Sequence, residues 1–420
     1  MFSMILSIII FFICLAFIVS EKINKAIVAI AGASICLVCH LVDQHDAFHL
    51  FIDWNVIFLL IGMMIMVGII KDSGIFEYIA IFLAKKAHGS PKIIIVVLSI
   101  ISGVFAALIG DIAVAIIMVP ISILIAIELG LSPLPFVIAQ AIATNIGSAA
   151  TLIGDPSNLM IGSARGFTFL DYILNAAPLV AFLLIVTSAL NFYFFKKELV
   201  VTNERRARIM EFREKELLND MPLIVFSIIT FVIFITLLVL QQHLNYSPAT
   251  IALAAAVMLL LKAKKIDFEK FICNEIHWST ILFFIGLFIM VGSLEETGFI
   301  SMLSDSIVKV TGDNPKLLAV FLIWFTGIVA ACIDNIPYVA TMIHVVGNIT
   351  QDAGVWWAFV FGAVMSGNGS MIGSSSNIIS VSISKKSGYA ISFWTFTKYS
   401  ALTMGITYIF STLYVVLRYF

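Results

Sequence analysis

The chain is poor in charged residues. Only 12% of its 420 residues are Asp, Glu, Lys or Arg, whereas a soluble domain has about 25%. Lys and Arg total 24 and Asp and Glu total 25, so the formal net charge is −1 and no basic excess is available to neutralise phosphates. These shortages exclude a soluble enzyme and a nucleic-acid-binding protein, because so few polar residues could not cover a soluble fold.

Paired cysteines and cofactor motifs are also lacking. The five cysteines are odd in number and have no paired spacing, which predicts no disulfide framework. Cys36-Leu-Val-Cys39-His40 has the spelling of a haem-attachment motif, but it lies in an apolar run, where cysteine behaves as a small hydrophobic residue. No His-Glu-x-x-His motif or His-rich tract occurs, so we expect no cofactor, no metal and no enzyme activity.

Apolar residues are abundant instead. They make up 61% of the chain, and many lie in unbroken runs near the roughly 20 residues that a helix needs to cross a bilayer. The composition predicts an all-α polytopic protein of the cell membrane, with the lipid bilayer as its surroundings. The run 1–20 lacks a basic start and a cleavage site, so we interpret it as a retained span. The other clear spans are 26–42, 54–70, 172–195, 221–241, 247–263, 278–294 and 399–417.

Basic residues predict the orientation of these spans. If the charged linker 196–220 is cytoplasmic, alternating spans place 20 of the 24 Lys and Arg inside, Lys264 and Lys265 among them. This count requires that regions 91–165 and 316–384, which are apolar but interrupted, each contain one hairpin and one crossing. We therefore expect ten crossings, two re-entrant hairpins and both termini outside.

Two halves of the chain, 1–195 and 221–420, resemble each other. With a shift of 224 residues, Trp54–Gly74 aligns with Trp278–Gly298, and nine of the 21 positions are identical. Each half is expected to contain five crossings, an odd number, so the second copy must be inserted upside down. Inverted repeats are typical of secondary transporters, which bind their substrates near the membrane midplane between the repeats. This plan favours alternating access over a passive channel.

Each half contains a predicted hairpin, at 91–127 and at 316–347. The limbs of the first, about 17 residues each, meet at Gly110-Asp111, and the tip of the second is Asp334-Asn335. In this alignment Asp111 matches Asp334. A carboxylate at midplane depth costs a few kcal/mol and is a functional candidate, so both Asp are candidates for proton or cation coupling. The alternative is that each carboxylate caps the second limb of its hairpin.

Each half also contains a predicted broken helix, at 134–165 and at 354–384. Gly and Pro interrupt these helices, and Ser, Thr and Asn can satisfy the freed backbone groups or bind a small polar solute. The alternative is a kinked helix packed by small residues. Asp155 joins the two hairpin acids as a candidate for ion or proton coupling. The candidate substrate-binding residues are Asn145, Gly147, Ser148, Thr151, Gly154, Asn158, Asn335, Asn368, Gly369, Ser370, Gly373, Ser376 and Asn377.

Neither broken-helix motif contains Arg or Lys. A strongly anionic substrate normally requires such a group, so the site favours a neutral polar solute or a cation. Half-helix N-termini can still hold an anion. His344, in the second limb of the second hairpin, is interpreted as a packed or water-bonded residue rather than a proton relay. Cys332, near the second tip, has no thiol partners with which to form a three-sulfur site.

The motifs resemble those of the arsenite-permease family, also called arsenical pump membrane proteins. This group includes the pigment-cell P protein and some sodium/proton antiporters, and belongs to the ion transporter superfamily together with dicarboxylate/sodium symporters. The resemblance covers nearly the whole chain and rests on Asn145–Asn158, Ser366–Asn377 and Asp334–Pro337. Ser366 and Ser370 are small departures from the family pattern. At the first tip the family usually has Asp or Ser followed by Asn, whereas here Asp111 is followed by Ile112.

The resemblance implies a transport unit made of both hairpins and both broken helices, which moves against a scaffold. It also implies export of a small inorganic solute, arsenite or antimonite, by proton coupling through Asp111 and Asp334. Arsenite is neutral at pH 7, which agrees with the absence of cationic side chains from the motifs. The alternatives are a sodium/proton antiporter and then a dicarboxylate or citrate carrier. By analogy with the family, a homodimer and a cytoplasmic ATPase partner are also expectations.

Overall fold

The computed structural model describes residues 1–20, 22–263, 267–312 and 314–420, and within these ranges the chain is helical, without strands. Nine of the described helices are long and apolar enough to cross a membrane, which confirms the all-α polytopic class. Lys264 and Lys265, which contributed to the predicted orientation, lie outside the described residues.

Helices of the first half begin where the sequence offers a capping residue or a proline, whose ring is tolerated in the first turn. Asn24, Asp53 and Asp155 each accept a backbone N–H in the first turn of the helix that follows. The helices are α1 (Phe2–Ser20), α2 (Lys25–Val38), α3 (Gln44–Asp46), α4 (Trp54–Asp72), α5 (Ile75–Lys86), α6 (Pro91–Ile109), α7 (Asp111–Glu128), α8 (Leu134–Ser148), α9 (Pro156–Arg165), α10 (Phe169–Asn175) and α11 (Ala177–Phe195).

The linker contains α12 (Asn203–Glu211), and the second half repeats the order of the first. Its helices are α13 (Met221–Val239), α14 (Gln241–Leu244), α15 (Pro248–Lys262), α16 (Phe268–Glu275), α17 (Trp278–Glu296), α18 (Phe299–Thr311), α19 (Pro315–Ile333), α20 (Asn335–Ile349), α21 (Ala353–Met365), α22 (Ser375–Lys386) and α23 (Phe393–Tyr419).

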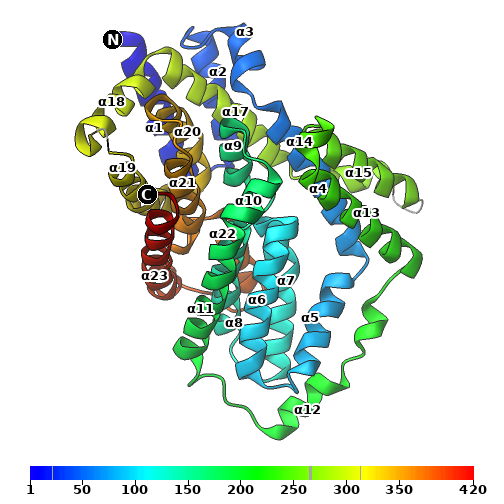
Figure 1. Ribbon diagram of the computed structural model, residues 1–420. Coiled ribbons are helices and arrows are strands. Elements are labelled where there is room, and N and C mark those ends of the chain that lie inside the picture. The colour runs from blue at the N-terminus through cyan, green and yellow to red at the C-terminus, as the bar shows by residue number, and fades with distance from the viewer. Residues whose placement is uncertain (21, 264–266, 313) are drawn as a thin grey trace.

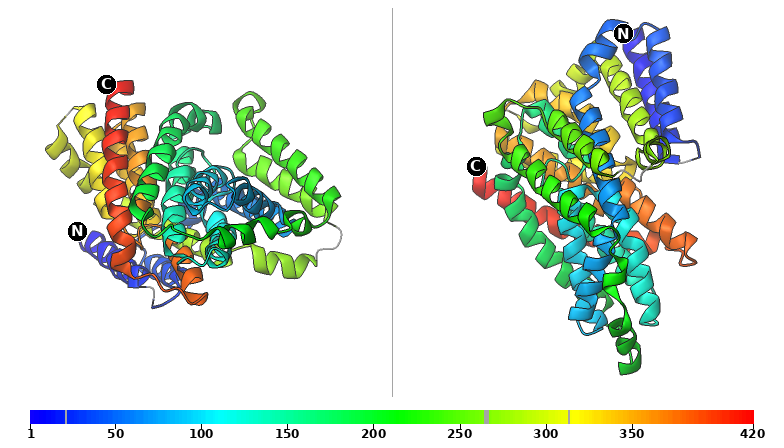
Figure 2. Two further views of the ribbon diagram at one scale, coloured as in Figure 1. Left: turned by 90° about the horizontal axis from the view of Figure 1, so that it is seen from below. Right: turned by 90° about the vertical axis from the view of Figure 1, so that its right-hand side faces the viewer.

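Helix packing follows the duplication seen in the sequence. α2 packs on α17, and α15 packs in the same way on α4. Glycine makes both contacts close: a Cβ at Gly62 would touch the backbone of Ala252, and one at Gly286 would touch the backbone of Ala29. These four helices, with α1 and α13 packed on α2 and α15, are called the scaffold below. Figure 2 shows the blue N-terminal helices beside the yellow-green α17.

The interrupted regions form a second body, called the central unit below. It consists of two helical hairpins, α6–α7 and α19–α20, and two broken helices, α8–α9 and α21–α22. α6 packs along α8, and α19 packs along α21. In Figure 1 the first hairpin lies in the lower half of the view, near the linker helix α12, and the second lies in the upper half. The elements of one repeat also meet those of the other, since α7 packs on α22 and α20 on α9.

Helix length alone does not separate hairpin limbs from crossings. α6, α7 and α19 have 19, 18 and 19 residues and qualify by length, although the sequence assigned them to hairpins. α2, α8 and α15 have only 14 to 15 residues and fall short, although the sequence assigned each to a crossing. The chain turns back between α6 and α7 within one residue, Gly110, whose φ of 89° an L side chain rarely adopts.

Candidate functional site

Equivalent asparagine side chains support the breaks in the two broken helices. In the first, Asn158 Nδ2 donates to the backbone oxygens of Ser148 and Thr151, at 2.9 and 2.8 Å. In the second, Asn377 Nδ2 donates to the oxygens of Gly367 and Ser370, at 2.6 and 3.1 Å. These carbonyls lack helical partners because the helix is interrupted, and each amide supplies the missing donors. The amide groups of Asn158 and Asn377 therefore support the breaks.

A hydroxyl ties each break to the hairpin of its own repeat. Thr151 Oγ1 donates to the backbone oxygen of Ala107 in α6, and Ser370 Oγ donates to that of Ala331 in α19 at 2.5 Å. Both acceptors lie three residues before a hairpin tip. Tip and break are thus fixed to each other in both repeats, as two copies of one structural unit would be.

Asn145 joins the two breaks across the repeats. Its Nδ2 donates to Asn377 Oδ1 at 2.9 Å and to Asn368 Oδ1 at 3.2 Å. Its Oδ1 accepts from Ser376 Oγ at 3.1 Å. All four side chains are buried. Since one hydrogen bond contributes about 1 kcal/mol net, these three bonds, called the brace below, couple the two broken helices energetically.

Each hairpin tip meets the broken helix of the other repeat, and these two contacts, as distinct from the membrane crossings of the helices, are called the first and second crossing below. At the first crossing, Asn335 Nδ2 donates to Asp155 Oδ2 at 3.3 Å. At the second crossing, Ser374 Oγ donates to Asp111 Oδ2 at 3.4 Å. Asp155 and Ser374 occupy the same position in their repeats, since each is the N-cap of the second half of its broken helix. The two crossings are therefore equivalent in backbone but differ in the element that supplies the carboxylate.

The tips correct the alignment made from the sequence. Gly110 ends α6 with φ 89° and ψ 152°, and Asp334 ends α19 with φ 78° and ψ 141°. Asp334 is therefore the equivalent of Gly110, and Asp111 is the equivalent of Asn335. The predicted match of Asp111 with Asp334 is wrong, because similar residue types were aligned in place of similar backbone positions. The capping alternative holds for Asp334, which accepts from Ile336 N, but Asp111 is the first residue of α7 and not its cap.

Asp334 lies close to a lysine that the motifs did not reveal. Ser375 Oγ donates to Asp334 Oδ2 at 3.0 Å, and Lys25 Nζ of α2 donates to Ser375 Oγ at 2.9 Å. Lys25 also lies over the ring of Phe283 in α17, 5.0 Å from its centre. A scaffold cation thus reaches a buried carboxylate of the central unit through one hydroxyl.

Two cavities separate the scaffold from the central unit. One, of about 100 Å³, lies between α4 and the first hairpin tip and is lined by Asp111, Gly154, Lys71 and Glu275. The other, of about 310 Å³, lies beside the second tip and is lined by Lys25, Asp334 and Ser375. The two cavities share Ile112, His277 and Thr280 as a common wall. Lys71 and Glu275 form an ion pair at 2.8 Å.

A third cavity, of about 180 Å³, lies between the scaffold and the first broken helix. It is lined by Asn55 and Pro248, which are the equivalents of Ser279 and Lys25 in the second cavity. There the scaffold faces Leu152 in the break, and Leu159, Gly162 and Ser163 beyond it. At the second cavity the scaffold faces the second hairpin tip as well as the break. Equivalent scaffold positions therefore face different parts of the two repeats.

The structure brings most of the sequence-predicted residues together. Asp111, Asp155 and Asp334 are only 3%, 3% and 9% exposed, and each bonds to a hydroxyl or an amide at a crossing or at the second tip. Of the predicted glycines, Gly147 allows close approach, since a Cβ there would meet the backbone of Gly103. The breaks or their flanks also contain Ser148, Thr151, Gly154, Asn158, Asn368, Gly369, Ser370, Gly373, Ser376 and Asn377.

His344 has a partner that the sequence did not predict. Its Nδ1 lies 2.6 Å from Glu295 Oε2, which links α20 of the central unit to α17 of the scaffold. The sequence interpretation of His344 as a packed or water-bonded residue did not include this carboxylate. Cys332 is exposed, as are Cys39 and Cys273, whereas Cys14 and Cys36 are buried.

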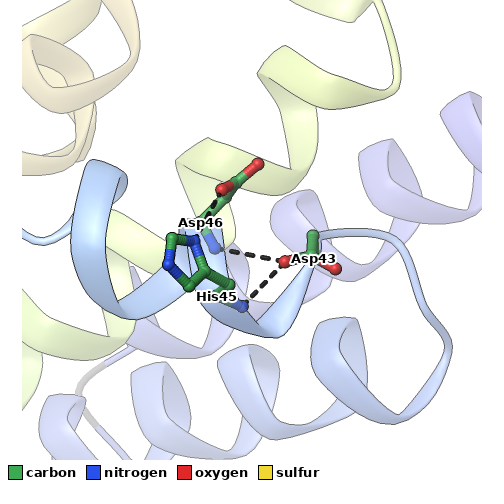
Figure 3. A group of neighbouring side chains, drawn as sticks. All are labelled: Asp43, His45 and Asp46. Carbon is green, nitrogen blue, oxygen red and sulfur yellow. Dashed lines mark hydrogen bonds and ion pairs between the residues drawn. The ribbon is translucent and has the colours of Figure 1, made fainter.

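A group of acidic and histidine side chains lies on the loop between α2 and α4 (Figure 3). Asp43 Oδ1 accepts the backbone N–H groups of His45 and Asp46, and His45 Nδ1 lies 3.2 Å from Asp46 Oδ1. Helix capping of α3 accounts for the position of Asp43. Its distance in sequence from both motifs and its exposure separate this group from the crossings.

Four residues at the cavities were missed: Lys25, Lys71, Glu275 and His277. Lys25 and Lys71 lie near ends of scaffold helices, Glu275 ends α16, and His277 precedes α17. All four lie outside both broken-helix motifs, and no local pattern marks them. The motifs contain no Lys or Arg, but Lys25 and Lys71 line the cavities beside them. A signal did exist for Lys25, since it occupies the first position of a helix whose copy begins with Pro248.

Comparison with known proteins agrees with a transport function. A family model described as a citrate transporter matches residues 15–362. An uncharacterized transporter of Mycobacterium bovis is 36% identical over 413 residues, covering 96% of both chains. The 46 kDa membrane protein of Mycobacterium leprae is 34% identical over 427 residues, covering 99% of both. The P protein of Homo sapiens is 27% identical, covering 94% of this chain and 58% of its own length.

Proposed function

The chain belongs to the citrate transporter family, and on this premise we propose that this membrane transporter is a secondary active carrier that works by alternating access. One observation supports the proposal above all. The two halves repeat one backbone plan, yet Lys25 shares its cavity with a hairpin tip and a break, whereas its equivalent Pro248 faces the first broken helix between Leu152 and Gly166. Inverted repeats that exchange such geometries open a central site first to one side and then to the other.

The moving body in this proposal is the central unit, and the coupling groups are its three buried carboxylates. Asp111, Asp155 and Asp334 come from both repeats and lie at or beside the two crossings. A buried carboxylate is costly unless a proton or a cation compensates its charge, so binding of either stabilises the central unit. We infer coupling to protons or to sodium ions.

The net charge at the cavities favours a neutral substrate. Three acidic groups, Asp111, Asp334 and Glu275, line the two cavities with two lysines, Lys25 and Lys71, and each lysine already has an oxygen partner. The breaks add hydroxyl and backbone groups at Gly154 and Ser375 and the apolar side chains of Ile153 and Ile372. This favours a small oxygen-rich solute without charge, and export of arsenite or antimonite is the leading candidate.

A second candidate is a small carboxylate such as citrate. The two lysines favour it, since the ammonium groups lie on the cavity walls and the sequence motifs alone offered no cation. A carboxylate would need a co-bound cation to offset the acidic groups around it. The description of the matching family favours the same class of substrate.

One transport assay separates these candidates. Purified protein in liposomes is given a proton gradient or a sodium gradient, and fluxes of arsenite, citrate and sodium are measured side by side. Gradient-driven arsenite flux supports the leading candidate, and gradient-driven citrate flux supports the second. Solute flux that ignores both gradients contradicts the proposed coupling. Asp334→Asn should remain folded and lose at least about tenfold of the pH-dependent flux.

The orientation proposed for this carrier places the linker in the cytoplasm and both termini outside. Arg205 of the linker donates to the backbone oxygens of Leu129 and Gly130, and Lys85 pairs with Glu214 at 2.6 Å. The open end of the first hairpin therefore lies on the linker side. Proteolysis of inside-out and right-side-out vesicles tests this: trypsin should cleave the linker only in inside-out vesicles.

A further inference from the structure

Lys25 has a position that the transport function alone does not explain. We propose that Lys25 is a tethered cation: in this conformation it compensates the Asp334 carboxylate, and the coupling cation must displace it. The inference rests on the proposed cation coupling and assigns Lys25 a part in it. Lys25 belongs to the scaffold, whereas Asp334 belongs to the central unit.

The hydrogen-bond chain fits a cation held at the site. The Ser375 hydroxyl has one hydrogen, which it donates to Asp334 Oδ2 at 3.0 Å, and its oxygen accepts from Lys25 Nζ at 2.9 Å. Because the ammonium group can only donate and the ionised carboxylate can only accept, the hydroxyl must accept from Lys25 and donate to Asp334. An incoming proton or sodium ion at Asp334 removes the charge that attracts the ammonium group.

The first repeat shows that the fold does not require this pair. At the position of Asp334 it has Gly110, and at the position of Lys25 the other scaffold copy has Pro248. The same backbone is thus built without either charge. Lys25 comes from the first half and Asp334 from the second, and the two equivalent positions, Pro248 and Gly110, have neither charge, which favours a role in charge coupling.

The third cavity indicates that the contact exists in one state only. There the lining around Pro248 extends to Gly162 and Ser163 and contains no hairpin-tip residue. The equivalents of these two residues are Val381 and Ser382, which do not line the cavity of Lys25. When the two interfaces exchange geometry, as inverted repeats do in alternating access, Lys25 moves toward Val381 and Ser382 on α22 and leaves Asp334.

Chemical labelling of Lys25 tests the displacement directly. Purified full-length protein in detergent is treated with an amine-reactive ester at rising sodium concentration or falling pH, and the modified peptides are quantified by mass spectrometry. At a fixed pH, sodium that displaces the Lys25 ammonium group from Asp334 should raise the labelling of Lys25 about tenfold. Asp334→Asn should show this high level of labelling without sodium. Lys22, exposed in the same connection, serves as the internal control.

Cation binding by variants gives the second measurement. Lys25→Met keeps the aliphatic stem over Phe283 and removes the charge, so its half-saturating sodium or proton concentration should fall about tenfold. Lys22→Met should match the wild type, and Lys25→Arg should stay near it. In an Asp334→Asn background, Lys25→Met should have no effect. Lys25→Gln is the second variant if the Met form aggregates.

Two results would overturn the inference. Labelling of Lys25 that is independent of both cations means that no displacement occurs. Weaker cation binding in Lys25→Met, or an increased substrate KM with unchanged cation binding, means that Lys25 has a structural or substrate-binding role. Because both measurements need no flux, a shift without any transport contradicts the proposed function alone, and coupled transport without a shift contradicts this inference alone.

Discussion

The two crossings share a backbone and differ in charge. At one, the hairpin residue Asn335 donates to a carboxylate on the broken helix, Asp155. At the other, the broken-helix residue Ser374 donates to a carboxylate on the hairpin, Asp111. The duplicated fold thus fixes a carboxylate beside a neutral donor at both crossings and leaves open which element supplies the acid.

The tips differ further. The second has an extra carboxylate, Asp334, linked through Ser375 to Lys25, where the first has Gly110. The difference teaches that backbone symmetry and charge symmetry serve separate ends in this protein. In the proposed mechanism, the repeated backbone provides two exchangeable interfaces, and the unequal charges allow ion binding to favour one conformation over the other.

The largest expected effect comes from exchanging the acid at the second crossing. Asp111→Asn removes its carboxylate and should lower cation-driven flux at least tenfold, since the coupling group is lost. Asp111→Asn combined with Ser374→Asp gives this crossing the residue types of the first and should restore most of the flux. Liposome transport and ²²Na⁺ binding measure both.

Ser374→Asp alone is the control, and it adds a second acid beside Asp111 without replacing one. If the double variant is no better than Asp111→Asn, then the position of the acid matters and the equivalence of the two crossings fails.

The next effect compares the packing of the two breaks. A Cβ at Gly154 would press on the backbone oxygen of Ser148, whereas at its equivalent, Gly373, the nearest atom is Ser366 O at 2.9 Å. Gly154→Ala should cost about 3 kcal/mol and Gly373→Ala about 1 kcal/mol, because overpacking strains the break. Thermal unfolding in detergent measures the difference, and equal shifts would argue against unequal packing.

A smaller contrast is expected between the two supporting amides. Asn158→Ala and Asn377→Ala each leave two buried carbonyls without a donor, at a cost of about 2 kcal/mol. Because the two bonding patterns match, the two shifts should agree to within about 0.5 kcal/mol. Asn377 also accepts from Asn145, so a distinctly larger loss at Asn377 would assign that brace a substantial energy.

The smallest effect concerns the linker, which pairs with α5 through Glu214 and Lys85. The hydrogen bond from Lys85 lowers the pKa of the Glu214 carboxyl below its usual value. A lowered folded-state pKa means that the pair stabilises above the unfolded-state pKa and that this stabilisation is lost as pH falls through the folded-state value. Glu214→Gln should lower Tm by about 1 °C at pH 7 and by less in acid. A difference in Tm that grows in acid would contradict this.

The sequence revealed the elements that repeat and missed those that do not. Trp54–Gly74 and its copy identified the duplication, and glycine-rich motifs located both breaks, because these features recur at a fixed spacing. The alignment of the tips failed, since the backbone that makes Asp334 the equivalent of Gly110 is a property of φ and ψ and not of residue type. Similar residue types were a misleading guide there.

Contacts between scaffold and central unit could not be predicted. Lys25 and Ser375 lie 350 positions apart, and His344 and Glu295 are on helices that no motif connects. Asn158 and Asn377 were expected to bind substrate, but their amide nitrogens are occupied by backbone carbonyls of the breaks. A polar side chain in a motif can serve the backbone or the ligand, and residue type does not distinguish the two.

The hydrogen bonds of Asn145 bear on how well the proposed transport pathway is sealed against leakage. A protein with two half-pathways side by side would leak if either could slide open while the other stayed shut. The hydrogen bonds of Asn145 with Asn368, Asn377 and Ser376 join the two breaks, so we expect neither half-pathway to open independently of the other. In the proposed mechanism, one buried side chain, present in a single copy, thereby limits uncoupled leakage.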